Sequence, residues 1–208
     1  MKKPLFIKII FLILLVYLLI IYLWYLYPSG FFCMEYKNVG KIKLKDLNNG
    51  PYLFVVDHEE HPLMSSMIIS QELHNHSDKN QKYNVVTKDC NEKFTKLPYF
   101  TKYNIIKVKG KTVGKCIEKI KNKENVVIFL RKEKSKNTGI YYILKETKIP
   151  IVLIKKKIIK QPDDNSGAIL LKYRKAYTEL NYNLYDNYEI EKKEPGEFLK
   201  WLQNELFN

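Results

Sequence analysis

Residues 51–62, Pro-Tyr-Leu-Phe-Val-Val-Asp-His-Glu-Glu-His-Pro, join an apolar run directly to a charged loop. The run 52–56 is short and rich in β-branched and aromatic residues, which is typical of a strand buried on both faces of a sheet. Similar runs follow at 83–87, 104–108, 126–130, 150–155 and 168–173. Helical patterns lie at 63–75, 111–123, 136–148 and 196–207. This alternation predicts an α/β domain with a mainly parallel sheet flanked by helices.

The apolar residues are most concentrated upstream of this domain. Residues 9–27 carry no charge, follow three lysines and end in a cluster of aromatic side chains. A helix of this length covers a hydrocarbon core of about 30 Å, so we expect a transmembrane helix and a single-pass membrane protein. A cleaved signal peptide is the alternative, but its apolar region would be shorter and would end in small residues. The predicted organisation is an anchor at 1–30, a connector at 31–50 and the α/β domain at 51–208.

The charge of the chain is strongly positive and is carried almost entirely by lysine. Lysine and arginine total 36 against 22 acidic residues, a net charge of +14, and only Arg131 and Arg174 are arginine. A surface that reads bases or phosphates usually relies on arginine forks, so the composition argues against a nucleic-acid partner. A lysine-rich body is instead attracted to an anionic membrane leaflet. We therefore expect membrane lipids as partners.

All four histidines of the chain, at positions 58, 61, 74 and 76, fall within nineteen residues. His58 and His61 follow the strand at 52–56, and working residues of parallel sheets lie at the carboxyl ends of strands. Three interpretations stay open: a solvated polar loop, a metal site that also uses Asp57 and Cys90, or a general base. Pro62 argues against a metal-binding His-Glu-x-x-His helix. We therefore predict no metal site.

Four blocks of sequence carry a resemblance to a known family. They are Val86-Thr87-Lys88 with Leu97-Pro98-Tyr99-Phe100, the run 104–109, the run 126–135, and Gly139 through Ile149-Pro150-Ile151-Val152. In order and spacing, residues 51–157 resemble the glycerolipid acyltransferases, which acylate glycerol 3-phosphate or its 1-acyl derivative. The resemblance implies an acyl thioester, acyl-CoA or acyl carrier protein, as co-substrate and no further cofactor. It also implies a role in phospholipid metabolism.

The same resemblance assigns roles to three residues of this chain. It makes His58 the general base that takes a proton from the acceptor hydroxyl. It places Lys109 and Lys134 at two arginine positions, of which the family uses the one at Lys134 on the acceptor phosphate, and we expect both lysines to hold the substrate phosphate. Lysine keeps the charge there but loses the bidentate geometry.

The family pattern is broken at several chemical positions, and Arg131 and Lys132 replace its glutamate and glycine. The family pairs its histidine with an aspartate in Asn-His-x-Ser-x-x-Asp, and that aspartate falls on Leu63 when His58 is the histidine; with His61 in that role, it falls on Ser66. Such a carboxylate fixes the tautomer of the histidine and stabilises the imidazolium. Two functions therefore remain: an acyltransferase that acts on a lysophospholipid or glycerol 3-phosphate, or a catalytically inactive lipid-binding or scaffold protein of the same fold.

Overall fold

The computed structural model describes residues 3–26, 35–47, 50–58, 65–66, 68–69, 72–73, 81–87, 104–108, 110–132, 138–160, 177–186 and 189–208. Within them, seven strands form one sheet in the order β1-β7-β6-β2-β5-β3-β4. The strands are β1 (Glu35–Asn38), β2 (Leu53–Asp57), β3 (Tyr83–Thr87), β4 (Asn104–Lys107), β5 (Asn125–Leu130), β6 (Ile151–Lys160) and β7 (Tyr177–Tyr185). The helices are α1 (Lys3–Leu26), α5 (Thr112–Lys121), α6 (Gly139–Thr147) and α8 (Pro195–Phe207).

The sheet is mixed, because β6 and β7 pair antiparallel while the other neighbouring strands pair parallel. β2 lies between β5 and β6, and every one of its residues is buried. The predicted strands at 52–56, 83–87, 104–108, 126–130 and 150–155 correspond to β2 to β6. The predicted strand at 168–173 lies outside the described residues, and two strands, β1 and β7, were not predicted.

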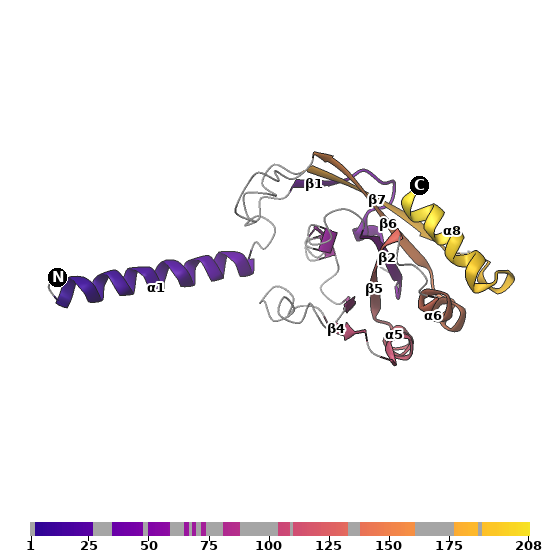
Figure 1. The fold of residues 1–208 in the computed structure, drawn as a ribbon, viewed down its shortest axis with the longest axis horizontal. Helices are drawn as coiled ribbons and strands as arrows, with labels where there is room; N and C mark the ends of the chain where they lie inside the picture. Colours follow the sequence, from indigo (N-terminus) through magenta and orange to yellow (C-terminus); the bar gives the residue numbers. More distant parts are fainter. Residues whose placement is uncertain are drawn as a thin grey trace.

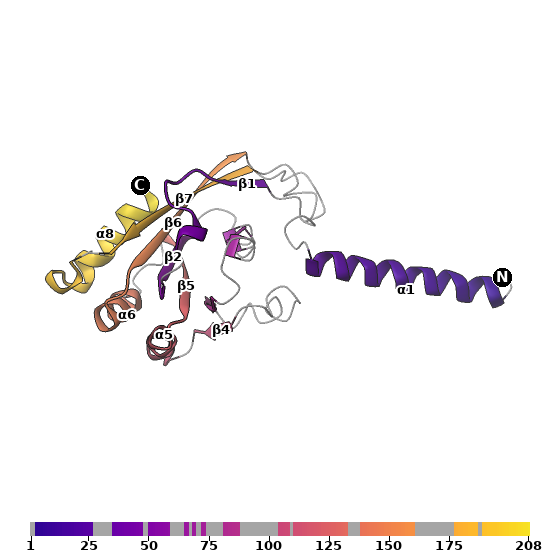
Figure 2. The ribbon, with the colours of Figure 1, turned by 180° about the vertical axis from the view of Figure 1, so that it is seen from behind.

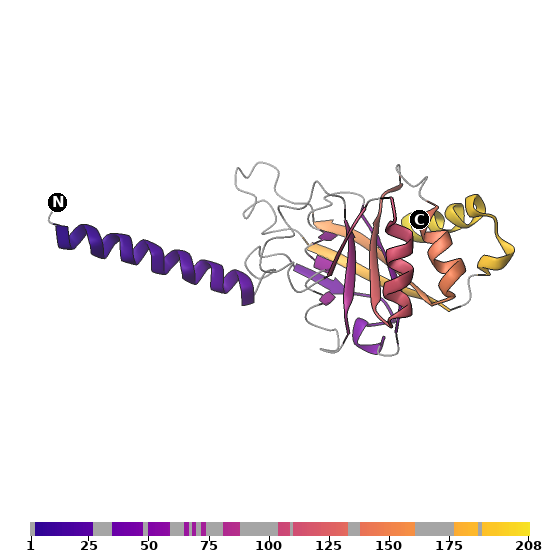
Figure 3. The same cartoon turned by 90° about the horizontal axis from the view of Figure 1, so that it is seen from below.

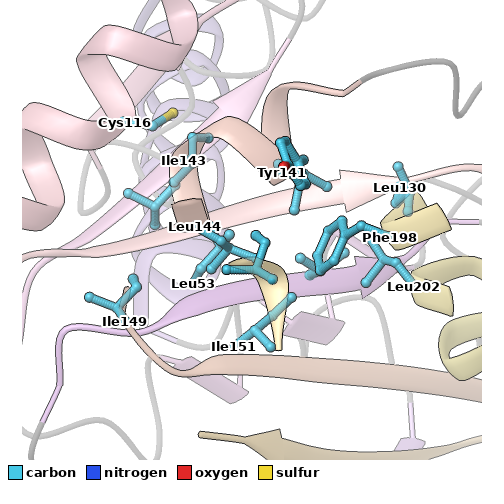
Figure 4. Packing of buried hydrophobic residues seen from close by; sticks show 14 of the residues in the cluster. Leu53, Cys116, Leu130, Tyr141, Ile143, Leu144, Ile149, Ile151, Phe198 and Leu202 are labelled. Carbon is cyan, nitrogen blue, oxygen red and sulfur yellow. The ribbon is translucent and has the colours of Figure 1, made fainter. Parts of the chain in front are cut away.

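Three helices cover one face of the sheet (Figures 1 and 3). α8 begins with a reciprocal cap in which Glu194 and Glu197 satisfy each other's backbone N–H groups, and Pro195 fills its first position. Its fully buried Phe198 meets Tyr141 of α6, with ring centroids 5.8 Å apart. Figure 4 shows these side chains packed with Leu53 of β2 and Ile151 of β6. The layer seals this face against water.

The opposite face of the sheet is covered by shorter pieces of chain. A 3-10 turn at Leu44–Asp46 and the helical residues described between 65 and 73 pack their apolar side chains here. Phe54 and Val56 of β2 point into this second cluster, whereas Leu53 and Val55 point toward α5, α6 and α8. Successive side chains of a strand alternate between the two faces of a sheet. The same alternation determines to which face of the sheet the side chains after β2 point.

The prediction of a single-pass transmembrane anchor over residues 1–30 is wrong. In the part of the chain that the structure describes, no helix is both long enough and apolar enough to span a bilayer. The predicted fold class is corrected to α/β with a mixed sheet, and the predicted localisation is withdrawn. α1 extends away from the sheet in Figures 1 and 2.

Candidate functional site

The register of three neighbouring strands brings together the residues that follow β2 and β5. Asp57 pairs with Leu130, and Val56 pairs with Ile154 of β6. The His58 N–H continues the ladder by donating to the Leu130 carbonyl over 2.9 Å. Extended to the residue after Asp57, this register places His58 between Arg131, which follows β5, and Lys156 of β6. We call these three residues the edge site, because His58 and Arg131 follow the carboxyl ends of the central strands β2 and β5.

The side chain of His58 lies on the face opposite α5, α6 and α8. Its ring packs against Phe129, with ring centroids 5.0 Å apart, and Phe129 belongs to the apolar cluster of that second face. Asp57 has the parity of Leu53 and Val55, so its buried side chain lies on the helix-covered face. Asp57 and His58 therefore lie on opposite faces of the sheet.

The imidazole of His58 has no orienting carboxylate among the described residues. Its Nδ1 atom is buried and makes no hydrogen bond to any group in that part of the chain. Burial, and after it the positive charges of Arg131 and Lys156, together lower the pKa of His58 to about 4. His58 is therefore neutral near pH 7 and a weak base.

Lys156 is held in place by Ser65, which no pattern in the sequence had indicated. Its Nζ donates a hydrogen bond of 2.6 Å to Oγ of Ser65, which is only 1% exposed. Arg131 differs, because no carboxylate within the described ranges forms an ion pair with it. Lys107, which pairs with Thr87 at the end of β3, shares the face and extends the positive charge along the same edge.

The two lysines predicted to bind phosphate are not tested by this geometry. Lys109 and Lys134 both lie outside the described residues, as do Leu63, His61, His74, His76 and Cys90. Among the residues that are described, no group of three or more His, Cys, Asp or Glu side chains could hold a metal ion. Of the predicted site residues, the structure thus places His58 alone. Arg131 and Lys156 could have been found only from the register of β2 with its neighbours.

The lowered pKa of His58 predicts a pH-dependent stability. The unfolded chain has the ordinary histidine value of 6.5, so between about 6.5 and about 4 it binds more protons than the folded chain. The free energy of unfolding should therefore fall as the pH is lowered through this window. Urea unfolding at about pH 7 and about pH 5 measures the loss. His58→Gln should reduce it, and an unchanged slope in that variant would contradict the assignment.

The edge site combines two fixed cations with a neutral imidazole on a half-buried surface. Such a site favours an anion, because Arg131 and Lys156 supply positive charge and N–H donors. It does not favour proton abstraction, because protonating His58 would place a third positive charge beside the other two.

Comparison with known proteins adds no identification to this geometry. No protein-family model matches the chain, and no curated protein matches it.

Proposed function

We propose that the chain is an acyltransferase-like protein that binds a phosphate monoester, glycerol 3-phosphate or the headgroup of a lysophospholipid, without acyl transfer by a histidine–carboxylate pair. The single observation that carries the proposal is the position of His58 between Arg131 and Lys156, with a buried Nδ1 that has no partner among the described residues. A phosphate monoester carries about 1.5–2 negative charges near pH 7, which two cations can neutralise.

The low proton affinity of His58 argues against acyl transfer. A general base is most effective when its pKa lies near the working pH, and a hydrogen-bonded carboxylate would raise the proton affinity of the imidazole. Two neighbouring cations do the opposite at His58, whose pKa is about 4. Its ability to take the proton of an acceptor hydroxyl is correspondingly low.

The wider charge of the protein fits lipid-type ligands. The chain has a net charge of +14, and Lys107 adds to the cations at the edge of the sheet. An anionic lipid surface and an anionic acyl thioester would both be attracted to such a body. Binding to vesicles that contain anionic lipid should then weaken with added salt, because exposed charges are screened over about 10 Å at 0.1 M salt.

Acyl transfer to a lysophospholipid or glycerol 3-phosphate is the second candidate. One observation favours it: the imidazole of His58 is neutral at physiological pH, and only the neutral form accepts a proton. In this alternative, the acceptor hydroxyl would attack the acyl carbonyl of the thioester while His58 takes its proton. The C–S bond would then break, and the departing thiolate would take that proton and leave as a thiol.

One experiment separates the two candidates. Glycerol 3-phosphate binding is measured by calorimetry, and transfer of a labelled acyl group from acyl-CoA to lysophosphatidic acid is measured on the same preparation of the full chain. The proposal expects binding, and transfer no faster than that of the His58→Ala variant. Transfer that is lost in His58→Ala would establish the second candidate instead. Absence of glycerol 3-phosphate binding would overturn the proposal.

A further inference from the structure

We propose that anion binding at the edge site is coupled to proton uptake by His58, so that the bound anion is held by Arg131, Lys156 and the imidazolium of His58 together. The inference rests on the proposed function, because its ligand is the phosphate monoester described above. It adds a regulation of that site by pH.

In the free protein, the surroundings of His58 allow the ring to take up a proton when an anion binds. The ring lies between two cations on neighbouring strands, packs against Phe129 on one side and has a buried Nδ1 without a partner in the described part of the chain. A protonated imidazole has two N–H donors, whereas the neutral ring has one. A bound anion could accept one of these hydrogen bonds.

The charged groups that face His58 explain why the free ring is neutral. Arg131 follows β5 and Lys156 belongs to β6. Burial is the largest cause of the lowered pKa of His58, and the charges of these two residues are the next. The helical residues that cover this face contribute the hydroxyl of Ser65, which is bonded to Lys156.

Two carboxylates lie near these elements, and both are directed elsewhere. Asp57 belongs to the opposite face of the sheet by its parity in β2. Glu72, in the helical residues above the second face, acts on Tyr182 of β7, where burial and then the Glu72 charge raise the tyrosine pKa. The described residues thus provide no counter-charge that would stabilise an imidazolium at position 58.

A bound anion supplies that missing charge. An opposite charge within about 4–6 Å favours the charged form of a titratable group, so an anion seated on Arg131 and Lys156 raises the pKa of the ring between them. Linkage is reciprocal: if the anion promotes protonation, protonation strengthens binding of the anion. The affinity should therefore fall as the pH rises, by up to about tenfold per pH unit between the two pKa values of the ring.

The test counts protons during binding by calorimetry on the full chain. Sodium sulfate, glycerol 3-phosphate and lysophosphatidic acid are each titrated at about pH 6 in two buffers that differ in ionisation enthalpy. Sulfate does not titrate in this range, so protons taken up with it belong to the protein. Glycerol 3-phosphate and lysophosphatidic acid distinguish a free phosphate ester from a lipid headgroup. For both, the difference between wild type and His58→Gln cancels the ionisation of the ligand.

We expect an uptake of about 0.5–1 proton per bound anion in the wild type and close to none in His58→Gln. The matched control is Lys157→Gln, because Lys157 is exposed and lies beside Lys156 on the other face of β6; its proton uptake should equal that of the wild type. Binding without His58-dependent uptake would overturn this inference and leave the proposed function standing. Failure of all three probes to bind would overturn both.

Discussion

Replacing both Arg131 and Lys156 with glutamine is expected to lower the affinity for glycerol 3-phosphate by about a hundredfold or more. A hydrogen bond to a charged group contributes about 1.5–3 kcal/mol, so each single replacement should cost about ten- to a hundredfold. The two effects need not add, because both residues would contact the same anion and both act on His58. Calorimetric titration of the two single variants and the double variant measures the losses and their coupling.

The control for this series is a lysine that neighbours Lys156 in β6 but points to the other face of the sheet. Lys157 is the next residue of β6 and is exposed, and its Lys157→Gln variant removes the same charge from the chain. It should bind glycerol 3-phosphate within about twofold of the wild type, because exposed charges at a distance are screened. Equal losses in Lys156→Gln and Lys157→Gln would show that net charge, and not the edge site, governs binding.

Truncating Phe198 to alanine is expected to lower the free energy of unfolding by about 3–5 kcal/mol. Phe198 is fully buried and contacts Tyr141 and Trp201, with ring centroids 5.8 and 5.3 Å away. Removing its ring takes away packing between α8 and α6 and leaves a cavity beside Tyr141, which Figure 4 shows next to Phe198. Urea unfolding followed by circular dichroism measures the change.

A substitution on the exposed face of the same helix provides the comparison. Lys200 lies two residues from Phe198 in α8 and is exposed. Lys200→Ala should change the free energy of unfolding by no more than about 0.5 kcal/mol. If Phe198→Ala changed the free energy of unfolding as little as Lys200→Ala, that result would contradict the packing of α8 against α6 in the core.

The central strands could be predicted because their sequences are nearly unbroken apolar runs. A strand buried on both faces leaves such a run, and β2 and β5 both show it. The outer strands could not be predicted in this way. β1 is the polar stretch Glu35–Asn38. In β7, polar and apolar residues alternate, and the strand pairs antiparallel with β6. The pairing of β1 and β7 depends on contacts that are distant in the sequence.

The candidate site was predictable only in part. His58 follows a buried strand, so its place at the carboxyl end of β2 could be read from the sequence. The direction of its side chain and of Asp57 required the parity of β2 against two packed layers. Arg131 and Lys156 are distant from His58 along the chain, and only the register of three parallel strands brings them beside it. No pattern in the sequence indicates the hydrogen bond that Lys156 donates to Ser65.

Nuclear magnetic resonance can follow the ring nitrogens of His58 directly while glycerol 3-phosphate is added to the full chain. The His58 signals are assigned by their loss in His58→Gln, since the chain has four histidines. We expect them to shift and saturate at the affinity that calorimetry gives for the wild type. Saturable binding that leaves the His58 signals unmoved would place the ligand elsewhere and contradict an anion site between Arg131 and Lys156.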